Sequence, residues 1–270
     1  MIFDTHAHYD DEAFDEDRKE LLLNMTENGI GTIVNVGADM ESSKKSLTLS
    51  EEYPFIYAAL GVHPSGTKEL NEEYMIWLKE TAFSHSVQNG GKVAAIGEIG
   101  LDYYWNDEEQ PDKEIQKEWF ERQIVVAKEV KLPIIIHSRE AAKDTYEIMK
   151  AQQAGENGGI VHCYSYSREL AGDFLDMGFS FGIGGVLTFK NSRKLKEVVE
   201  YAPLESLLLE TDCPYLAPVP NRGKRNSSLN IPYVAQAIAE IKGIEAEKVI
   251  EVTRENGYRV FPKTRVNNGC

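Results

Sequence analysis

The sequence of 270 residues is poor in cysteine and lacks any long run of apolar residues. Its three cysteines, Cys163, Cys213 and Cys270, are an odd number without paired spacing, which argues against a disulfide framework and suits a reducing compartment. No apolar run approaches the roughly 18 residues that a membrane-spanning helix needs. The N-terminal segment is acidic and lacks the basic start of a signal peptide. We therefore expect a cytoplasmic protein with no membrane partner.

Positive charge is also scarce, with 29 lysines and arginines against 44 acidic residues and a net charge of −15. An acidic surface repels a nucleic-acid duplex, which disfavours a protein that coats nucleic acid. Net charge is a sum over the whole chain, however, and carboxylates that bind divalent cations reverse the field locally. The composition therefore says little against a metal-dependent enzyme.

Short apolar runs alternate with longer amphipathic segments from one end of the chain to the other. Eight such runs occur, at 1–6, 32–37, 55–63, 92–100, 132–138, 158–164, 178–185 and 206–212. Helical periodicity between and after them is found, for example, at 18–28, 116–131 and 233–242. Strands that alternate with helical crossovers run parallel, and eight units predict a closed (β/α)8 barrel, with an open doubly wound sheet as the alternative.

The chain contains no linker or low-complexity tract that would divide it. We therefore predict an α/β fold, a single-domain (β/α)8 TIM barrel over residues 1–262, followed by a C-terminal tail at 263–270. Helical segments at 230–242 and 245–260 predict one extra helix beyond the eighth unit. No heptad pattern or long apolar edge is evident, so we expect a monomer.

Histidines gather at the ends of the predicted strands. Residues i and i+2 of a strand project to the same side, so His6 and His8 of the opening "MIFDTHAHYDD" are expected to point together. Five of the six histidines and two acids share strand-end positions: His6, His8, His63, Glu98, His137, His162 and Asp212. A barrel builds its active site at that rim, and imidazole with carboxylate suits Zn²⁺, Mn²⁺ or similar ions. The pattern favours two divalent ions, with Cys163 and Cys213 expected to point away as buried thiols.

The same residues lie in motifs that resemble a known family. The segments "DTHAH", "GVHP", "GEIGLDY", "IIIHSREA", "HCY" and "ETDCPYLAP" followed by "NRGKRN" are similar to the TatD family of metal-dependent deoxyribonucleases, within the amidohydrolase-like barrels. The resemblance runs from residue 2 to about residue 261. It implies two metal ions (Mg²⁺, Mn²⁺ or Zn²⁺), bridged by Glu98, with the ligands His6, His8, Glu98, His137, His162 and Asp212. One departure is Ser227–Ser228, where the family pattern has Glu-Pro.

A paired metal site lowers the pKa of a bound water from 15.7 toward ~7 and neutralises a phosphodiester. We therefore expect an enzyme, a two-metal hydrolase that cleaves phosphodiester bonds of DNA. Glu98 would lie beside the attacking water, and Asp212 would ligate a metal and accept a proton. His63 would contact the phosphate or the leaving group; the alternative is a turn histidine held by Pro64.

Basic and aromatic residues near the predicted site suggest how substrate binds. The loop "NRGKR" at 221–225 places Arg222, Lys224 and Arg225 beside Asp212, and Arg139 closely follows His137. These cations form a predicted phosphate grip, the alternative being a solvated loop that neutralises nearby acids. Rim aromatics such as Tyr103 are expected to stack on unpaired bases. Without an extended basic face, the expected DNA partner is a strand end or single strand, and the resemblance implies a 3′–5′ exonuclease.

Two other functions compete with this one. An amidohydrolase acting on esters, lactones or amides, including deacylation of aminoacyl-tRNA, would use the same chemistry, because activated water attacks carbonyl carbon as readily as phosphorus. Many such barrels bridge their metals with a modified lysine, whereas strand 4 here offers Glu98, which favours the nuclease. A scaffold or binding protein with a vestigial site is the other alternative, and the presence of all six ligand-type residues argues against it.

Overall fold

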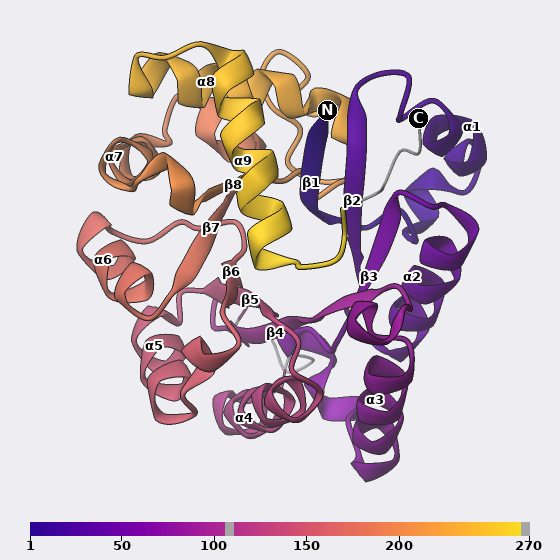
Figure 1. Cartoon of the computed structure of the whole chain (residues 1–270). Helices are drawn as coiled ribbons and strands as arrows, with labels where there is room; N and C mark the ends of the chain where they lie inside the picture. The colour runs from indigo at the N-terminus through magenta and orange to yellow at the C-terminus, as the bar shows by residue number, and fades with distance from the viewer. Residues whose placement is uncertain (106–110, 266–270) are drawn as a thin grey trace.

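Parallel strands form the centre of the structure, a computed structural model that describes residues 1–105 and 111–265. Within these residues eight strands pair in chain order, each with the next (Figure 1). The strands are β1 (Ile2–Ala7), β2 (Ile30–Val36), β3 (Ile56–Leu60), β4 (Val93–Asp102), β5 (Ile134–Arg139), β6 (Gly159–Val161), β7 (Phe179–Ile183) and β8 (Leu207–Leu209).

The last strand meets the first and closes the barrel. The Thr5 hydroxyl in β1 donates to the Leu209 carbonyl in β8, at 3.1 Å. Just beyond β8, the Asp212 backbone N–H donates to the His6 carbonyl, at 2.9 Å. A parallel bridge between Ala7 and Cys213 extends this seam. The nearly closed barrel confirms the predicted (β/α)8 fold over the doubly wound alternative.

Helices surround the barrel; the first seven connect consecutive strands, and the last two follow β8 (Figure 1). They are α1 (Arg18–Leu23), α2 (Met40–Glu52), α3 (Glu72–Ser84), α4 (Lys113–Val130), α5 (Ala142–Ala151), α6 (Arg168–Asp176), α7 (Arg193–Tyr201), α8 (Ile231–Lys242) and α9 (Ala246–Val260). Across the described part of the chain, no helix combines the length and apolar character that a bilayer span requires. Residues 266–270 of the predicted tail, which include Cys270, lie outside the described residues.

The first helix is shorter than its periodicity predicts. A helix was expected over 18–28, but α1 ends at Leu23 and turns follow. The side-chain amides of Asn24 and Asn28 donate to the carbonyls of Glu20 and Asn24, at 3.0 and 2.7 Å. Asparagine competes in this way with the regular helix for backbone partners, which explains the early end.

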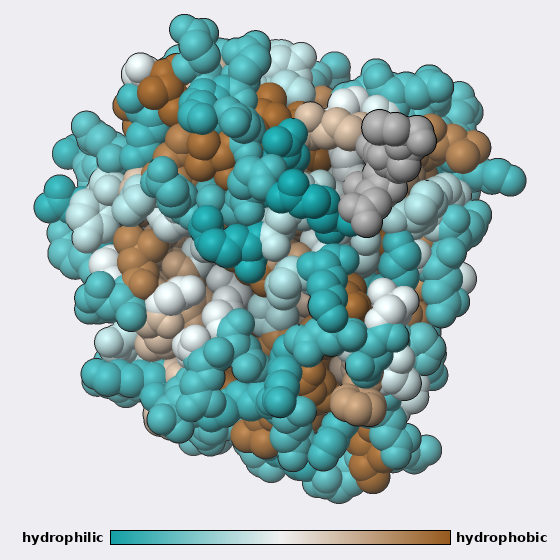
Figure 2. Space-filling view, viewed as in Figure 1, coloured by the Kyte–Doolittle hydropathy of each residue, from teal (hydrophilic) through white to brown (hydrophobic). Residues whose placement is uncertain are grey.

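The extra helix α9 covers the end of the barrel where the strands begin. In Figure 1 it crosses the centre of the view, and Figure 2 shows mostly hydrophilic side chains over it from the same side. Its inner face packs on Phe3 at the start of β1, with ring centroids 5.3 Å from Tyr258 and 5.9 Å from Phe261. Gly257 allows this approach, because an added Cβ would lie 2.5 Å from the Phe3 ring. With this end sealed, the opposite rim is left for chemistry.

We expect Gly257→Val to destabilise the fold, because overpacking a filled core costs about 1–3 kcal/mol. Calorimetry should show a lower Tm. Lys248→Val, on the exposed side of the same helix, controls for the low helix propensity of valine. Equal shifts in Tm for the two variants would contradict the packing argument.

Candidate metal centre

The strand-end residues converge at the rim opposite α9. His6 belongs to β1, Glu98 to β4 and His137 to β5. His8 and His162 follow directly on β1 and β6, and Asp212 lies beyond the end of β8 at Leu209, so that the short strands β6 and β8 leave His162 and Asp212 in loops. The structure therefore brings together the six residues that the family resemblance implies as ligands, from segments as far apart in the chain as His6 and Asp212.

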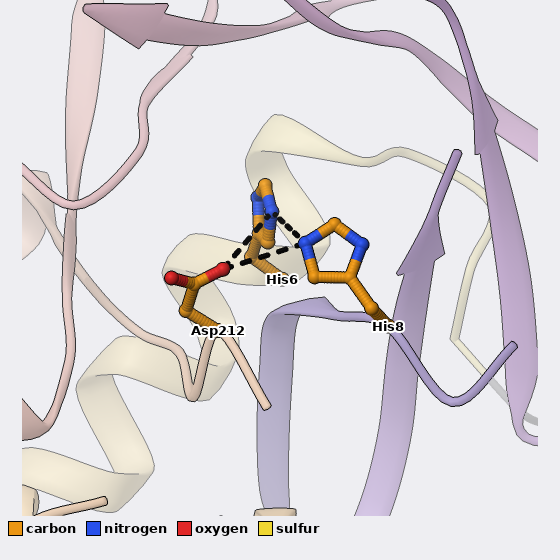
Figure 3. Close-up of side chains that lie close together, drawn as sticks. All are labelled: His6, His8 and Asp212. Atoms are coloured by element: carbon orange, nitrogen blue, oxygen red, sulfur yellow. Dashed lines mark hydrogen bonds and ion pairs between the residues drawn. The ribbon is translucent and has the colours of Figure 1, made fainter. Parts of the chain in front are cut away.

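Four donor atoms lie close together between β1, β4 and the end of β8. His6 Nε2 lies 3.0 Å from His8 Nε2, 3.4 Å from Glu98 Oε2 and 3.8 Å from Asp212 Oδ1. His8 Nε2 lies 3.4 Å from Asp212 Oδ1 and 3.9 Å from Glu98 Oε2. Figure 3 shows His6, His8 and Asp212 pointing toward one another.

These spacings fit one divalent ion. Zinc–ligand bonds of about 2.0–2.2 Å in a tetrahedron place neighbouring donor atoms about 3.4 Å apart. The five distances between 3.0 and 3.9 Å scatter around that value. The set consists of two imidazole nitrogens and two carboxylate oxygens, which are donor types that bind such ions.

Glu98 faces histidines on both sides. Its Oε2 is directed to His6 and His8, as described above, whereas its Oε1 lies 2.6 Å from His137 Nδ1 and 3.5 Å from His162 Nε2. The carboxylate is almost fully buried, with 4% of the residue exposed. Each oxygen therefore addresses its own pair of imidazoles, which is the arrangement that a bridging carboxylate needs.

The electrostatics of the cluster favour added positive charge. Burial opposes ionisation of Glu98, but the imidazoles of His162 and His6 hold its pKa well below the usual range. Burial likewise opposes protonation of His8 and His162, but nearby carboxylates raise their pKa to about 9 and about 10. The principal partners are Asp212 for His8 and Glu210 with Glu98 for His162. Carboxylates that attract protons so strongly also attract a metal cation.

Three of the histidines face an acceptor on the far side of the ring, and for His8 and His137 this contact is a hydrogen bond. His8 Nδ1 lies 2.8 Å from the Val36 carbonyl, which directs Nε2 into the cluster. His137 Nε2 lies 3.2 Å from Asp102 Oδ2, which leaves Nδ1 facing Glu98. His162 Nδ1 lies 3.3 Å from Glu210 Oε1 in an ion pair that does not have hydrogen-bond geometry, while its Nε2 faces Glu98. Such partners fix the tautomer and orientation of metal-binding histidines.

Sequence reasoning missed Asp102 and Glu210. Both are buried acids that end or directly follow apolar strands, in "GEIGLDY" and "ETD", and that position was their available signal. Glu210 also accepts the Cys163 backbone N–H at 2.7 Å. Its carboxylate fills the space beside Gly182, where an added Cβ would lie 1.9 Å from Oε2.

The departure at Ser227–Ser228 lies beneath the cluster. Ser228 is fully buried, and its hydroxyl donates to Asp4 Oδ2 at 2.7 Å. Asp4 also accepts from the Thr211 hydroxyl at 2.8 Å, and burial raises the pKa of Asp4 to about 7. The Ser228 backbone N–H donates to the Tyr9 hydroxyl. Ser228 therefore ties the loop after β8 to β1 from a buried position.

His63 lies at the edge of the cluster. Its ring is edge-on to His137, with centroids 4.3 Å apart, and its Nδ1 accepts the Ser65 backbone N–H at 3.2 Å. Burial and the charge of His137 lower the pKa of His63 to about 3. His63, Asp102 and His137 also form a group whose donor atoms lie within 4.8 Å of one another. The contact with Ser65 agrees with a turn histidine, and the catalytic role stays a prediction.

The predicted substrate contacts are dispersed. Arg225 pairs with Asp17, with its Nη1 2.7 Å from Oδ1. This contact agrees with the alternative in which the loop neutralises nearby acids. Arg222 lies over the Phe189 ring, 4.4 Å from the centroid, and Lys224 is exposed. A cavity lies beside the cluster and is lined in part by residues between 184 and 195. Neither Arg222 nor Lys224 lines this cavity.

Arg139 and Tyr103 lie on the other side of the rim. Arg139 stacks on Tyr104, 3.7 Å from the ring centroid, and lines the cavity beside the cluster. The Tyr103 hydroxyl donates to Asp144 at 2.8 Å, so its polar end is engaged within the fold. Substrate roles for these residues stay predictions.

The expectation that Cys163 points away from the site is wrong. Strand β6 ends at Val161, so the alternation that the expectation relied on does not reach residue 163. Cys163 has a positive φ of 46° and lines the same cavity as His162 and Asp212. Burial, followed by the charge of Asp212, raises the pKa of its thiol well above the usual range. Cys213, in contrast, is fully buried as expected.

Comparisons with known proteins agree with this geometry. The family profile described as "TatD related DNase" matches residues 3–262. A metal-dependent hydrolase of Bacillus subtilis, YabD, is 45% identical over 97% of this chain and 99% of its own length. The Escherichia coli metal-dependent hydrolase YcfH is 34% identical over 97% of this chain and 96% of its own. The crystal structure of the Escherichia coli TatD homologue YjjV superposes with a TM-score of 0.87, at 30% identity, covering 96% of this chain and 97% of that one.

We expect Asp102→Asn and Glu210→Gln each to weaken divalent-metal affinity by about 10–100-fold, because a metal-binding histidine loses its charged partner. Titration calorimetry of metal-stripped protein with Mn²⁺ or Zn²⁺ measures this loss. Glu240→Gln, an exposed acid on α8, is the matched control. Unchanged affinity in both test variants would show that these acids do not support the ligands.

Removal of metal should lower thermal stability in a way that depends on His8. A ligand at a hundred times its Kd stabilises the folded state by about 2.7 kcal/mol, so a chelator should lower the Tm. His8→Ala should stay folded, since only a partly exposed ring is lost, but its Tm should respond much less to metal. His85→Ala, at the end of α3, should keep the full response. Loss of near-ultraviolet circular dichroism in His8→Ala would instead indicate a structural role.

Proposed function

The chain belongs to the TatD family of metal-dependent hydrolases, and we propose that it is a two-metal 3′–5′ exonuclease that hydrolyses DNA at single strands or strand ends. The observation that carries the proposal is the position of Glu98, whose two oxygens each face a different pair of histidines. One carboxylate between two donor sets supports a pair of ions rather than one.

The two donor sets divide the six predicted ligands. One consists of His6, His8, Asp212 and Glu98 Oε2, and the other of His137, His162 and Glu98 Oε1. When bound, a pair of divalent ions activates water near neutral pH and stabilises both the attacking and the leaving oxygen of a phosphodiester. The donor types admit Mg²⁺, Mn²⁺ and Zn²⁺.

In this proposal two side chains transfer protons, Asp212 and His63. Burial opposes ionisation of Asp212, but the contact with His8 keeps its pKa below the usual value, so that it is a carboxylate able to accept a proton at neutral pH. His63 accepts the Ser65 N–H at Nδ1, which leaves a proton on Nε2 of the neutral ring. That N–H is available to donate to a phosphate or leaving-group oxygen.

The preference for phosphodiesters is supported by the family description and by the cations at the rim. The profile that matches 260 residues of the chain is named for DNases. Arg139 lines the cavity next to His137 and His162, where a phosphate attached to the cluster would extend. Arginine recognises phosphate oxygens with directed hydrogen bonds.

The test is hydrolysis of 3′-labelled and 5′-labelled single-stranded DNA by metal-stripped protein titrated with Mg²⁺, Mn²⁺ and Zn²⁺. Metal-dependent release of mononucleotides from the 3′ end is expected, and Glu98→Ala and His137→Ala should abolish it, because both donor sets lose a member. Glu240→Ala serves as the control for a contaminating nuclease. No cleavage by protein that binds two ions would contradict the proposal and direct attention to carboxylic ester and amide substrates.

A further inference from the structure

A cavity of about 740 Å³ opens directly beside the metal cluster. His137, His162 and Asp212 form one wall, and the remaining lining comes from the ends of β5 and β7, the loops after β6, β7 and β8, and the first turn of α7. Its volume is in the range of cavities that enclose small ligands of about 300–1,000 Å³. A double helix does not enter a cavity of this size, whereas the end of an unpaired strand does.

The charge of this cavity is opposite to that of the whole protein. Three basic side chains, Arg139, Arg193 and Lys194, line it, and Asp212, already assigned to the cluster, is its one acidic lining residue among the described residues. Arg193 is paired with Glu197 at 2.9 Å. In the part of the chain that the structure describes, Arg139 and Lys194 have no carboxylate partner and are exposed. In a chain of net charge −15, two unpaired cations at this place favour an anionic ligand.

The cavity is also lined by apolar side chains. Tyr215 and Leu216 follow β8 and remain 56% and 36% exposed although they adjoin the cluster. The Tyr215 hydroxyl donates to Asp11 at 2.9 Å, which holds the ring at the rim. An exposed aromatic ring fixed in this way is a platform on which an unpaired base can stack.

We propose that this cavity binds the unpaired end of a polynucleotide strand, with Lys194 and Arg139 on its phosphates and Tyr215 with Leu216 against a base. The assignment rests on the proposed function and names the recognition site for it. It places the phosphate contacts on β5 and on the first turn of α7, and not on the 221–225 loop, where Arg225 is held by Asp17. Recognition therefore depends on an unpaired end rather than on a duplex surface.

Equilibrium binding tests the assignment separately from catalysis. The probe is a fluorescent single-stranded oligonucleotide with phosphorothioate linkages at its 3′ end, titrated with metal-loaded protein and followed by anisotropy. Lys194→Gln should raise Kd about tenfold, the loss expected for a hydrogen bond to a charged group. It should also reduce the slope of log Kd against log salt by about 0.7, the value for one phosphate contact on a single strand. Lys196→Gln, on the same helix but outside the cavity, is the control.

The base contact has its own test. Tyr215→Ala should raise Kd about tenfold, within the 1–3 kcal/mol of one stacked base, and Tyr215→Phe should restore binding. With an abasic 3′-terminal nucleotide, Tyr215→Ala should bind as the unaltered protein does. Tyr233→Ala, an exposed tyrosine on α8, should have no effect on either probe.

Failure of this inference differs from failure of the proposed function. If the unaltered protein cleaves DNA but Lys194→Gln and Tyr215→Ala bind like their controls, the cavity assignment is wrong and the exonuclease stands. If the protein binds the probe with the expected dependence on Lys194 and Tyr215 but cleaves no DNA with any metal, the binding site stands and the exonuclease is wrong.

Discussion

The pairing of the buried Glu98 carboxylate with imidazoles is the interaction on which the rest of the structure depends. An ionised carboxylate in the interior is costly unless several partners compensate it. Here the partners are imidazoles from both sides, His6 and His8 against one oxygen and His137 and His162 against the other. The register of the surrounding strands must be kept for these rings to meet the carboxylate, since a shift of one residue in a strand turns its side chains to the opposite face.

The sequence was sufficient to predict the closed barrel, the extra C-terminal helix and the strand-end residues that gather at the rim, His63 among them, whereas the set of six ligands was implied by the family resemblance. These predictions succeed because alternation along a strand sets the side to which a residue points, and because parallel strands all end at the same rim. Strand alternation gives the wrong side for Cys163. Strand β6 ends at Val161, so Cys163 follows a loop conformation and lines the cavity instead of pointing away. Asp102 and Glu210 share the strand-end position of the ligands, but only the fold shows that they lie behind the rings of His137 and His162.

The sequence also shows how many cations a loop contains, but not whether they are already paired. Loop 221–225 is the most basic stretch near the site, yet Arg225 is bound by Asp17, a residue more than two hundred positions earlier. Lys194 has no such partner in the described residues and reaches the cavity from α7. A cation is available to a ligand only when the fold leaves it without an internal anion, and that property is determined by tertiary contacts.

The seam between β1 and β8 sets the order in which the site is assembled during synthesis. Thr5 and Leu209 are 204 residues apart, so a nascent chain has β1 long before it has the strand that closes the barrel. Until that closure, β1 keeps an unpaired edge, and His6 and His8 lack Asp212 as a neighbour. The full donor set therefore arises only in the last stage of folding, because contacts of such high sequence separation form late. Binding of an ion that needs all four donors therefore requires a closed barrel.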